Sequence, residues 1–251
     1  KEVFDETDYK AAQLIADRIP NGATLQIGVG RIPDAVGNLL DGHKDLGVHT
    51  EMFSVSLMNL MKKGVINNSR KSLKPGKTVF AFAGGQRATQ EIYDFVDNNP
   101  DIEMNPISWV NDPYVVAELT NFISINSAIA VDLTGQVCSE SIGTTTFSGP
   151  GGQADFIRGA KLAPGGQSYI LINSTGKKKD GTLFSKINLA LAPGSGVTGS
   201  RADVQYIVTE YGVAEIRFRS IAERARAMIS IAHPQFREQL TYEARKAGYF
   251  I

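Results

Sequence analysis

Apolar residues along the chain follow two spacings, one typical of buried strands and one typical of helices. In the first half, short apolar runs alternate with stretches in which apolar residues recur every three or four positions. The runs predict strands over residues 24–27, 46–53 and 78–83, and the stretches predict helices over residues 8–18, 34–40, 54–63 and 89–97. Strands that alternate with helices indicate parallel pairing. The pattern therefore predicts an α/β fold with a mostly parallel open sheet and flanking helices.

The second half has shorter apolar runs, separated by residues that favour turns. The pattern predicts a short strand over residues 107–110, ending at the turn that Asn111 begins. It also predicts a hairpin of residues 123–133 and 136–140, strands over 168–172, 186–191 and 204–208, and helices over 221–231 and 234–247. No linker divides the sequence, so we expect one domain with some antiparallel hairpins.

Composition narrows the classes of function. The 251 residues include 26 basic and 26 acidic side chains, so no global field attracts nucleic acid or an anionic membrane. No apolar run approaches the roughly 18 residues of a membrane-spanning helix. The single cysteine, Cys138, can form no internal disulfide, which fits a reducing compartment or has no bearing on the compartment. We expect a cytoplasmic protein that binds neither nucleic acid nor membrane.

A glycine turn of Gly28, Val29 and Gly30 follows the first strand. It is close to the G-x-G-x-x-G fingerprint of dinucleotide-binding folds, and Glu51 stands roughly where an acidic residue would hold a ribose. Pro33 replaces the third glycine, which weakens this interpretation. Two others remain: a turn that only reverses the chain, and a cradle of backbone N–H groups for an anionic or carbonyl ligand.

Glu51 itself follows Thr50 near the end of a predicted strand. In an open parallel sheet, ligands bind beyond the carboxyl ends of the strands. A carboxylate at this place is either solvated surface or a functional group, since glutamate is mostly exposed in proteins.

A glycine-rich segment, from Gly149 to Gly152, precedes a predicted helix that includes Asp155. Three glycines in four residues lose much backbone entropy on folding. That loss is tolerated where another group must approach the backbone closely. The N–H groups at the start of the helix could bind phosphate or stabilise a developing oxyanion. We favour this interpretation over a plain loop.

Other candidate residues have ordinary structural explanations. None of the three histidines has the spacing of a metal ligand set, so we assign no metal site. We expect His49 and Cys138 to be packed in the interior. Residues 177–181 are basic and are more simply a solvated hairpin tip than an anion site. Glu210 is expected either to line a cleft or to bond to a neighbouring backbone.

The ordered motifs resemble those of the acetyl-CoA hydrolase/transferase family, in particular its 4-hydroxybutyrate and butyrate:acetate CoA-transferases. They stand at residues 28–33, 49–53, 151–156 and 209–214. The resemblance covers nearly the whole chain but corresponds only to the C-terminal half of such an enzyme. It implies that residues 1–251 are a C-terminal catalytic domain with a CoA-transferase fold, and that the N-terminal half is absent.

The resemblance also implies a reaction. CoA would move between a short-chain acyl-CoA and a carboxylic acid of the acetate, butyrate or 4-hydroxybutyrate type. Glu51 matches the family's nucleophile, which forms a glutamyl-CoA thioester, and Gly152 N–H would stabilise the oxyanion. Coenzyme A is then a substrate, and no tightly bound cofactor is expected. The residues implied to contact it are Gly28, Val29, Gly30, Arg31, Ile32, Asn111, Gly149 and Gly151.

Two alternatives stay open beside CoA transfer. Water could resolve the glutamyl thioester, which would make the protein an acyl-CoA hydrolase. The same fold could also serve as a non-catalytic module that binds CoA or a nucleotide. The partners implied by the resemblance are acyl-CoA, a short-chain carboxylate, the missing N-terminal half and further copies of the chain in a homo-oligomer.

Overall fold

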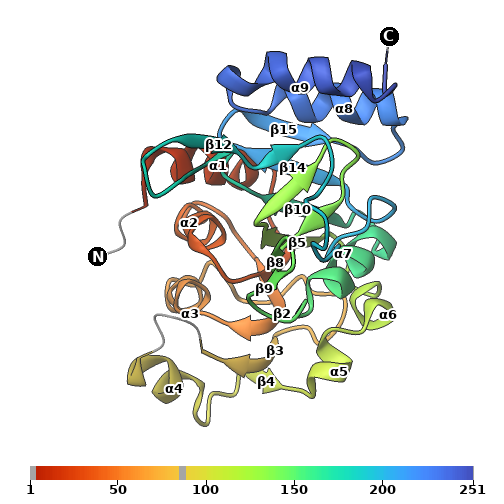
Figure 1. Cartoon of the computed structure of the whole chain (residues 1–251). Coiled ribbons are helices and arrows are strands. Elements are labelled where there is room, and N and C mark those ends of the chain that lie inside the picture. Colours follow the sequence, from red (N-terminus) through yellow and green to blue (C-terminus); the bar gives the residue numbers. More distant parts are fainter. Residues whose placement is uncertain (1–3, 85–88, 251) are drawn as a thin grey trace.

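A mostly parallel sheet forms the centre of the fold (Figure 1). In the computed structural model, which describes residues 4–84 and 89–250, eight strands lie side by side. Each neighbouring pair is parallel except β14 and β15. In spatial order the strands are β15 (Gly212–Glu215), β14 (Tyr206–Thr209), β10 (Gln167–Leu171), β5 (Phe122–Ser127), β1 (Thr24–Ile27), β2 (Gly47–Phe53), β3 (Thr78–Ala83) and β4 (Ile102–Met104). The predicted α/β class is confirmed.

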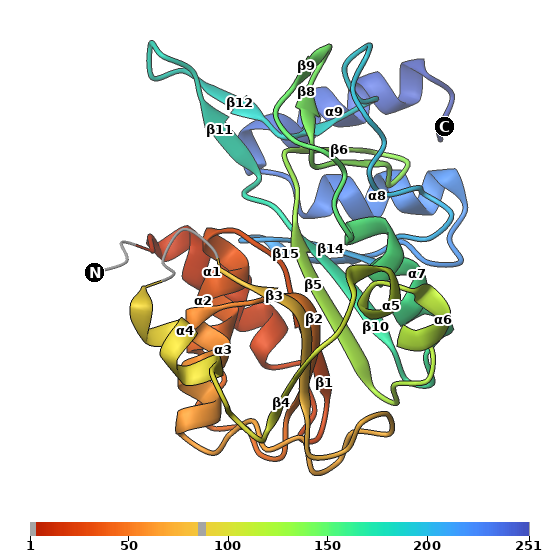
Figure 2. The ribbon, with the colours of Figure 1, turned by 90° about the horizontal axis from the view of Figure 1, so that it is seen from below.

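Helices cover both faces of this sheet (Figures 1 and 2). One face carries α1 (Glu6–Ala16), α2 (Arg31–Asn38), α3 (Val55–Lys62) and α4 (Gln90–Val96). The other carries α5 (Ile107–Val110), α6 (Pro113–Val116) and α7 (Gln153–Leu162), while α8 (Ile221–Ser230) and α9 (Pro234–Lys246) lie beside β15. Because both faces are covered, all four residues of β1 are buried.

Local sequence signals set where several helices begin. Asp5 caps α1 in a reciprocal pair with Asp8, in which each side chain accepts a hydrogen bond from the other's backbone N–H. Ser220 and Glu223 cap α8 in the same way. Such caps satisfy N–H groups that have no partner within the helix.

The strand order reverses between β1 and β5. From β1 the chain adds β2, β3 and β4 on one side, and later adds β5, β10, β14 and β15 on the other. In open α/β sheets a ligand binds beyond the carboxyl ends of the strands at such a reversal. Topology therefore marks the ends of β1 and β5 as the expected site.

Short strands in the second half of the chain form three small sheets beside the main one. β6 (Ala130–Asp132) pairs with both β7 (Val137–Cys138) and β13 (Ile187–Asn188), β8 (Ser141–Ile142) pairs with β9 (Thr145–Thr146), and β11 (Thr175–Lys177) pairs with β12 (Leu183–Ser185). The β8–β9 hairpin leads directly into the glycine loop, residues 148–152.

The prediction of a strand over residues 107–110 is wrong, because these residues form helix α5. The N–H groups of Trp109 and Val110 donate to the carbonyl of Pro106, which starts a helical turn. Four apolar residues fit either a buried strand or one buried turn of helix, so periodicity could not separate the two.

The prediction of one long hairpin over residues 123–140 is also wrong in part. Residues 122–127 form β5, which pairs in parallel with β1 and β10 in the main sheet. Only β6 and β7 pair as a hairpin. Similarly, the predicted strand over residues 186–191 is reduced to β13, next to β6. The apolar pattern is continuous from β5 to β6, so it gave no sign that the two strands belong to different sheets.

Candidate active site

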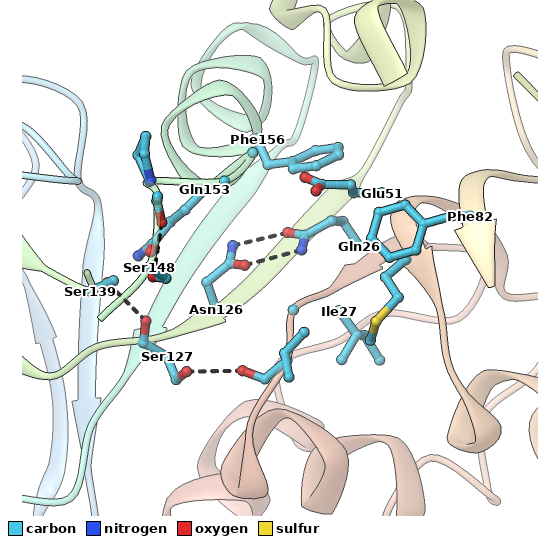
Figure 3. A pocket seen from close by; sticks show the side chains of 17 residues that line it. Gln26, Ile27, Glu51, Phe82, Asn126, Ser127, Ser139, Ser148, Gln153 and Phe156 are labelled. Carbon is cyan, nitrogen blue, oxygen red and sulfur yellow. Dashed lines mark hydrogen bonds between the residues drawn. The ribbon is translucent and has the colours of Figure 1, made fainter. Parts of the chain in front are cut away.

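A pocket of about 250 Å³ lies where the strand order reverses (Figure 3). The ends of β1, β2 and β5 form its base, and the glycine loop forms one side. Its lining residues are Gln26, Ile27, Gly28, Val29, Glu51, Met52, Phe82, Asn126, Ser127, Ser139, Ser148, Gly149, Pro150, Gly151, Gly152, Gln153 and Phe156. Both glycine motifs of the sequence thus contribute residues to a pocket at the place that the strand order predicts.

Glu51 is the charged residue of this pocket. It stands in the second half of β2 and is half-buried. Its Oε2 accepts a hydrogen bond of 2.8 Å from Nδ2 of Asn111, which ends helix α5. The described lining residues include no lysine, arginine or histidine. The carboxylate is therefore oriented by a neutral amide and has no cationic partner in the pocket lining.

The glycine loop comes very close to this carboxylate. A Cβ atom placed on Gly152 would lie 2.2 Å from Oε2 of Glu51 and 2.4 Å from Nδ2 of Asn111. The φ angle of Gly152 is −86°, which any residue can adopt. The close approach, and not the backbone conformation, requires glycine here. Gly152 is the N-cap of α7, so this helix begins close to the carboxylate of Glu51.

Asp155, in the first turn of α7, is a second carboxyl group near the pocket. The pKa of Asp155 is raised, mainly by burial and further by the negative charges of Glu51 and Asp112, whereas Arg158 opposes the shift. Glu51 and Asp112 thus add negative charge near the start of α7, and Arg158 is the cation that opposes them. Partial positive charge at the site comes from the helix start, which favours negative charge nearby.

A hydrogen-bonded polar cluster lies beneath the pocket. Nε2 of Gln26 donates to Oδ1 of Asn126 at 3.1 Å, and Oε1 of Gln26 accepts from Ser124 and from Asn126. A Cβ on Gly28 would lie 2.4 Å from Oδ1 of Asn126, so this glycine also permits close packing. Sequence reasoning missed the cluster, because Asn126 was assigned to a hairpin and not to the end of a central strand.

The first glycine turn is only partly in the pocket. Gly28 and Val29 line it, and Val29 is 56% exposed. Gly30 adopts φ = 141°, a conformation that favours glycine, but does not line the pocket. Arg31 pairs with Asp5 and Asp8 of the first helical region, and Ile32 is buried in the core. All five residues from Gly28 to Ile32 stay predictions as CoA contacts.

The later glycine loop places its predicted residues together. Gly149, Gly151 and Gly152 all line the pocket. Asn111 is not a lining residue, but it donates a hydrogen bond to Glu51, which is one. The lining residues that the sequence interpretation did not assign to the site are Gln26, Ile27, Met52, Phe82, Asn126, Ser127, Ser139, Ser148, Pro150, Gln153 and Phe156. Gln153 had a signal, since it directly follows Gly152.

The remaining candidates are structural. His49 is buried, and its Nε2 donates to the carbonyl of Val110 at 2.7 Å. Burial lowers the pKa of His49 to about 4, more than the Val110 bond raises it. Cys138 is buried, and residues 177–181 are exposed around the β11–β12 turn, both as predicted. Glu210 accepts from the backbone N–H of Ser174 at 3.0 Å.

Metal and membrane features can be stated for the part of the chain that the structure describes. There, no group of three or more His, Cys, Asp or Glu side chains is placed to hold a metal ion. In the same residues, every helix is too short or too polar to cross a membrane.

Known proteins give an independent view of the same chain. A sequence model described as the acetyl-CoA hydrolase/transferase C-terminal domain matches residues 88–244. The chain is 52% identical to the 4-hydroxybutyrate coenzyme A transferase of Clostridium kluyveri, over 92% of this chain and 52% of that protein. It is 45% identical to the butyryl-CoA:acetate CoA-transferase of Anaerostipes caccae, over 96% of this chain and 54% of that protein.

A solved structure matches equally well. RipA from Yersinia pestis superposes with a TM-score of 0.91 at 39% identity, over 100% of this chain and 55% of that one. The chain thus spans about half the length of the curated relatives it matches. The predicted family is confirmed: the chain belongs to the acetyl-CoA hydrolase/transferase family, and it matches the C-terminal domain of that family.

Proposed function

We propose that the chain is the catalytic C-terminal domain of a CoA-transferase, which moves CoA between a short-chain acyl-CoA and a carboxylic acid. The observation that carries this proposal is the carboxylate of Glu51, held in the pocket by Asn111 and approached by Gly152. The relatives named as CoA-transferases supply the substrate class, of the acetate, butyrate or 4-hydroxybutyrate type.

In the proposed mechanism Glu51 acts as a nucleophile. Its carboxylate attacks the thioester carbonyl of an acyl-CoA, the C–S bond breaks, and an acyl-glutamyl anhydride and CoA thiolate result. The thiolate then attacks the glutamyl carbonyl and releases the free acid, which leaves a glutamyl-CoA thioester. A second carboxylate repeats the sequence in reverse. The lack of a cationic partner in the pocket lining supports this role, because a paired carboxylate is a weaker nucleophile.

Each tetrahedral intermediate carries an oxyanion that needs hydrogen-bond donors. We assign this role to the N–H of Gly152, because the start of α7 faces the reacting carboxylate. Gly28, Val29, Gly149 and Gly151 line the pocket and are the proposed CoA contacts. Gly30, Arg31 and Ile32 belong to the same turn and stay proposed CoA contacts, although they do not line this pocket.

Hydrolysis is the second candidate, favoured by one observation. The rim of the pocket is open, since Val29 is 56% and Phe82 43% exposed. Water that enters such a pocket would resolve the glutamyl-CoA thioester. In the proposed transferase the N-terminal half, which the longer relatives possess, closes this side, and the enzyme assembles as a homo-oligomer.

The test replaces Glu51 with glutamine in the full-length protein. Glu51→Gln keeps an acceptor for Asn111 but cannot form the anhydride, so we expect unchanged folding and a loss of turnover by at least about 10³. Mass spectrometry of the wild type mixed with acetyl-CoA should show a CoA adduct on the peptide that contains Glu51. Glu118→Gln, at an exposed position, is the control.

Three outcomes separate the candidates. Full turnover in Glu51→Gln refutes the mechanism. A CoA adduct that decays to free CoA and unmodified Glu51, with no acyl-CoA formed from an added acceptor acid, identifies a hydrolase. Reversible CoA binding without any adduct identifies a non-catalytic binding module.

A further inference from the structure

The side chain of Gln153 carries a buried nitrogen that bonds to nothing in the part of the chain that the structure describes. Gln153 begins helix α7, is 8% exposed and lines the pocket. Its Nε2 atom is buried and has no hydrogen-bond partner among the described residues. An unsatisfied buried donor destabilises the folded state, so such atoms are rare and indicate a missing acceptor. A ligand in the pocket can supply that acceptor.

The neighbouring hydroxyl groups are already committed as donors. Each of three serines in the pocket donates its single hydroxyl proton to a backbone carbonyl: Ser127 to Val29, Ser139 to Ser127, and Ser148 to Gly149. Their oxygens retain lone pairs and can accept further bonds. On this side of the pocket, Nε2 of Gln153 therefore offers two N–H donors without a partner among the described residues, and the hydroxyl oxygens of Ser139 and Ser148 are available as acceptors.

The donor lies apart from the reacting carboxylate. Figure 3 shows Gln153 on the same side of the pocket as Ser139 and Ser148, with Glu51 and Phe82 on the other side. An acyl-CoA whose thioester carbon meets Glu51 must extend a different part of its structure toward Gln153. The wall near Gln153 suits a group that accepts one hydrogen bond and can donate another.

We propose that Nε2 of Gln153 binds an oxygen atom of the acyl-CoA other than the reacting carbonyl oxygen. The proposal rests on the proposed function, since Glu51 fixes which carbon reacts. Two parts of the substrate have the required chemistry. One is an amide of the pantetheine arm, with its C=O and N–H, and the other is a hydroxyl group on the acyl chain.

The test uses Gln153→Met in the full-length protein, because methionine keeps the length of the side chain and removes the amide. Loss of one hydrogen bond corresponds to about a five- to tenfold effect. If the pantetheine amide is bound, the Kd for free CoA measured by calorimetry rises by this factor. If an acyl hydroxyl is bound, the Kd for CoA is unchanged, and the ratio of kcat/KM for 4-hydroxybutyrate to that for butyrate falls by this factor.

Gln205→Met is the matched control. Gln205 is fully buried, and its Nε2 too has no partner among the described residues, but it lies outside the pocket. Its Oε1 accepts from the N–H of Ser168 at 2.8 Å. We expect Gln205→Met to lower Tm and leave ligand binding unchanged. Gln153→Met should not lower Tm, because it removes an unsatisfied donor.

Two results would overturn the proposal. One is a Gln153→Met protein with unchanged Kd for CoA and an unchanged ratio between the two acids. The other is a drop in Tm or a failure to fold, as this would show that the amide supports the fold. The calorimetric arm does not require turnover, so a protein that binds CoA but lacks transferase activity refutes the proposed function separately.

Discussion

Nδ2 of Asn111 donates a 2.8 Å hydrogen bond to Oε2 of Glu51 across 60 residues of sequence. Asn111 ends helix α5, and Glu51 lies in the second half of strand β2, so the bond joins these two elements. Among the described residues, Oδ1 of Asn111 is buried without a hydrogen-bond partner, so the Glu51 carboxylate is the group that holds this amide. The orientation of the proposed nucleophile thus depends on a residue far from it in the chain.

Removing this amide should impair chemistry more than binding. In Asn111→Ala the Glu51 carboxylate can rotate away from the thioester, and misplacement of a reacting group by about 1 Å typically costs about 10² in rate. We therefore expect kcat to fall about a hundredfold while the KM for acyl-CoA changes little. Steady-state kinetics of the full-length protein would measure both.

A second asparagine–glutamate pair provides the control for that experiment. Nδ2 of Asn105 donates to Oε1 of Glu103 at 3.0 Å, outside the pocket. Asn105→Ala should leave kcat and KM unchanged. If Asn111→Ala raised KM alone, Asn111 would be a binding residue and would not orient the nucleophile.

Gly152 is expected to tolerate no side chain. In Gly152→Ala the new Cβ would lie 2.2 Å from Oε2 of Glu51, so the carboxylate or the loop must move. Loss of one oxyanion donor lowers kcat by about 10²–10³. We expect a decrease in kcat of this size in the full-length protein, with a smaller change in KM.

Gly149→Ala separates crowding from a general effect on the loop. A Cβ at Gly149 would meet nothing within 4 Å, although the residue lines the same pocket. This variant should retain most of the wild-type kcat. An equal loss of kcat in both variants would show that loop flexibility, and not the close approach of Gly152 to Glu51, limits the reaction.

The sequence was sufficient to predict the first half of the fold because its strands are continuous apolar runs between amphipathic helices. It failed where an apolar segment was short, as in α5, or continued from one sheet into another, as after β5. Glu51 and the loop at Gly152 were predicted because glycine density and a strand-end carboxylate are visible along the chain.

The supporting residues could not be predicted in the same way. The contact between Asn111 and Glu51 depends on the path of α5, which was assigned as a strand. The bond between Gln26 and Asn126 depends on the parallel pairing of β1 with β5, which no local pattern encodes. Contacts across a sheet require the strand order, and the strand order is a property of the whole fold.

Acidification should destabilise the fold through His49. Its pKa is about 4 in the folded protein, because burial disfavours the charged ring, against 6.5 for an ordinary histidine. Between these values the unfolded chain binds more protons, so stability that is present above pH 6.5 is lost as the pH falls toward 4. The difference corresponds to about 3 kcal/mol of unfolding free energy.

The experiment compares wild type with His49→Gln between pH 7 and pH 4. Glutamine can still donate to the carbonyl of Val110 but does not titrate in this range. Trp109 is the single tryptophan of the sequence, and its ring centroid lies 5.6 Å from that of His49. Its fluorescence therefore reports the unfolding of residues 1–251 in urea close to His49. The variant should lose less stability than wild type. Parallel curves for the two proteins would contradict the role of His49.

Residues 1–251 alone should fold but turn over poorly. Helices cover both faces of the main sheet and enclose three apolar clusters, which is sufficient for an independent domain. The pocket, however, is open at Val29 and Phe82, and relatives of this chain are about twice as long. Without a second wall the thioester is exposed to water and the acceptor acid is not positioned beside Glu51.

Positioning of two reactants is worth several orders of magnitude in rate, so we expect turnover at least about a hundredfold below that of the full-length protein. Parallel assays with acetyl-CoA and butyrate would measure the difference. Equal turnover would mean that this chain contains the complete cleft, and that the exposed residues at its rim belong to an entrance and not to an interface.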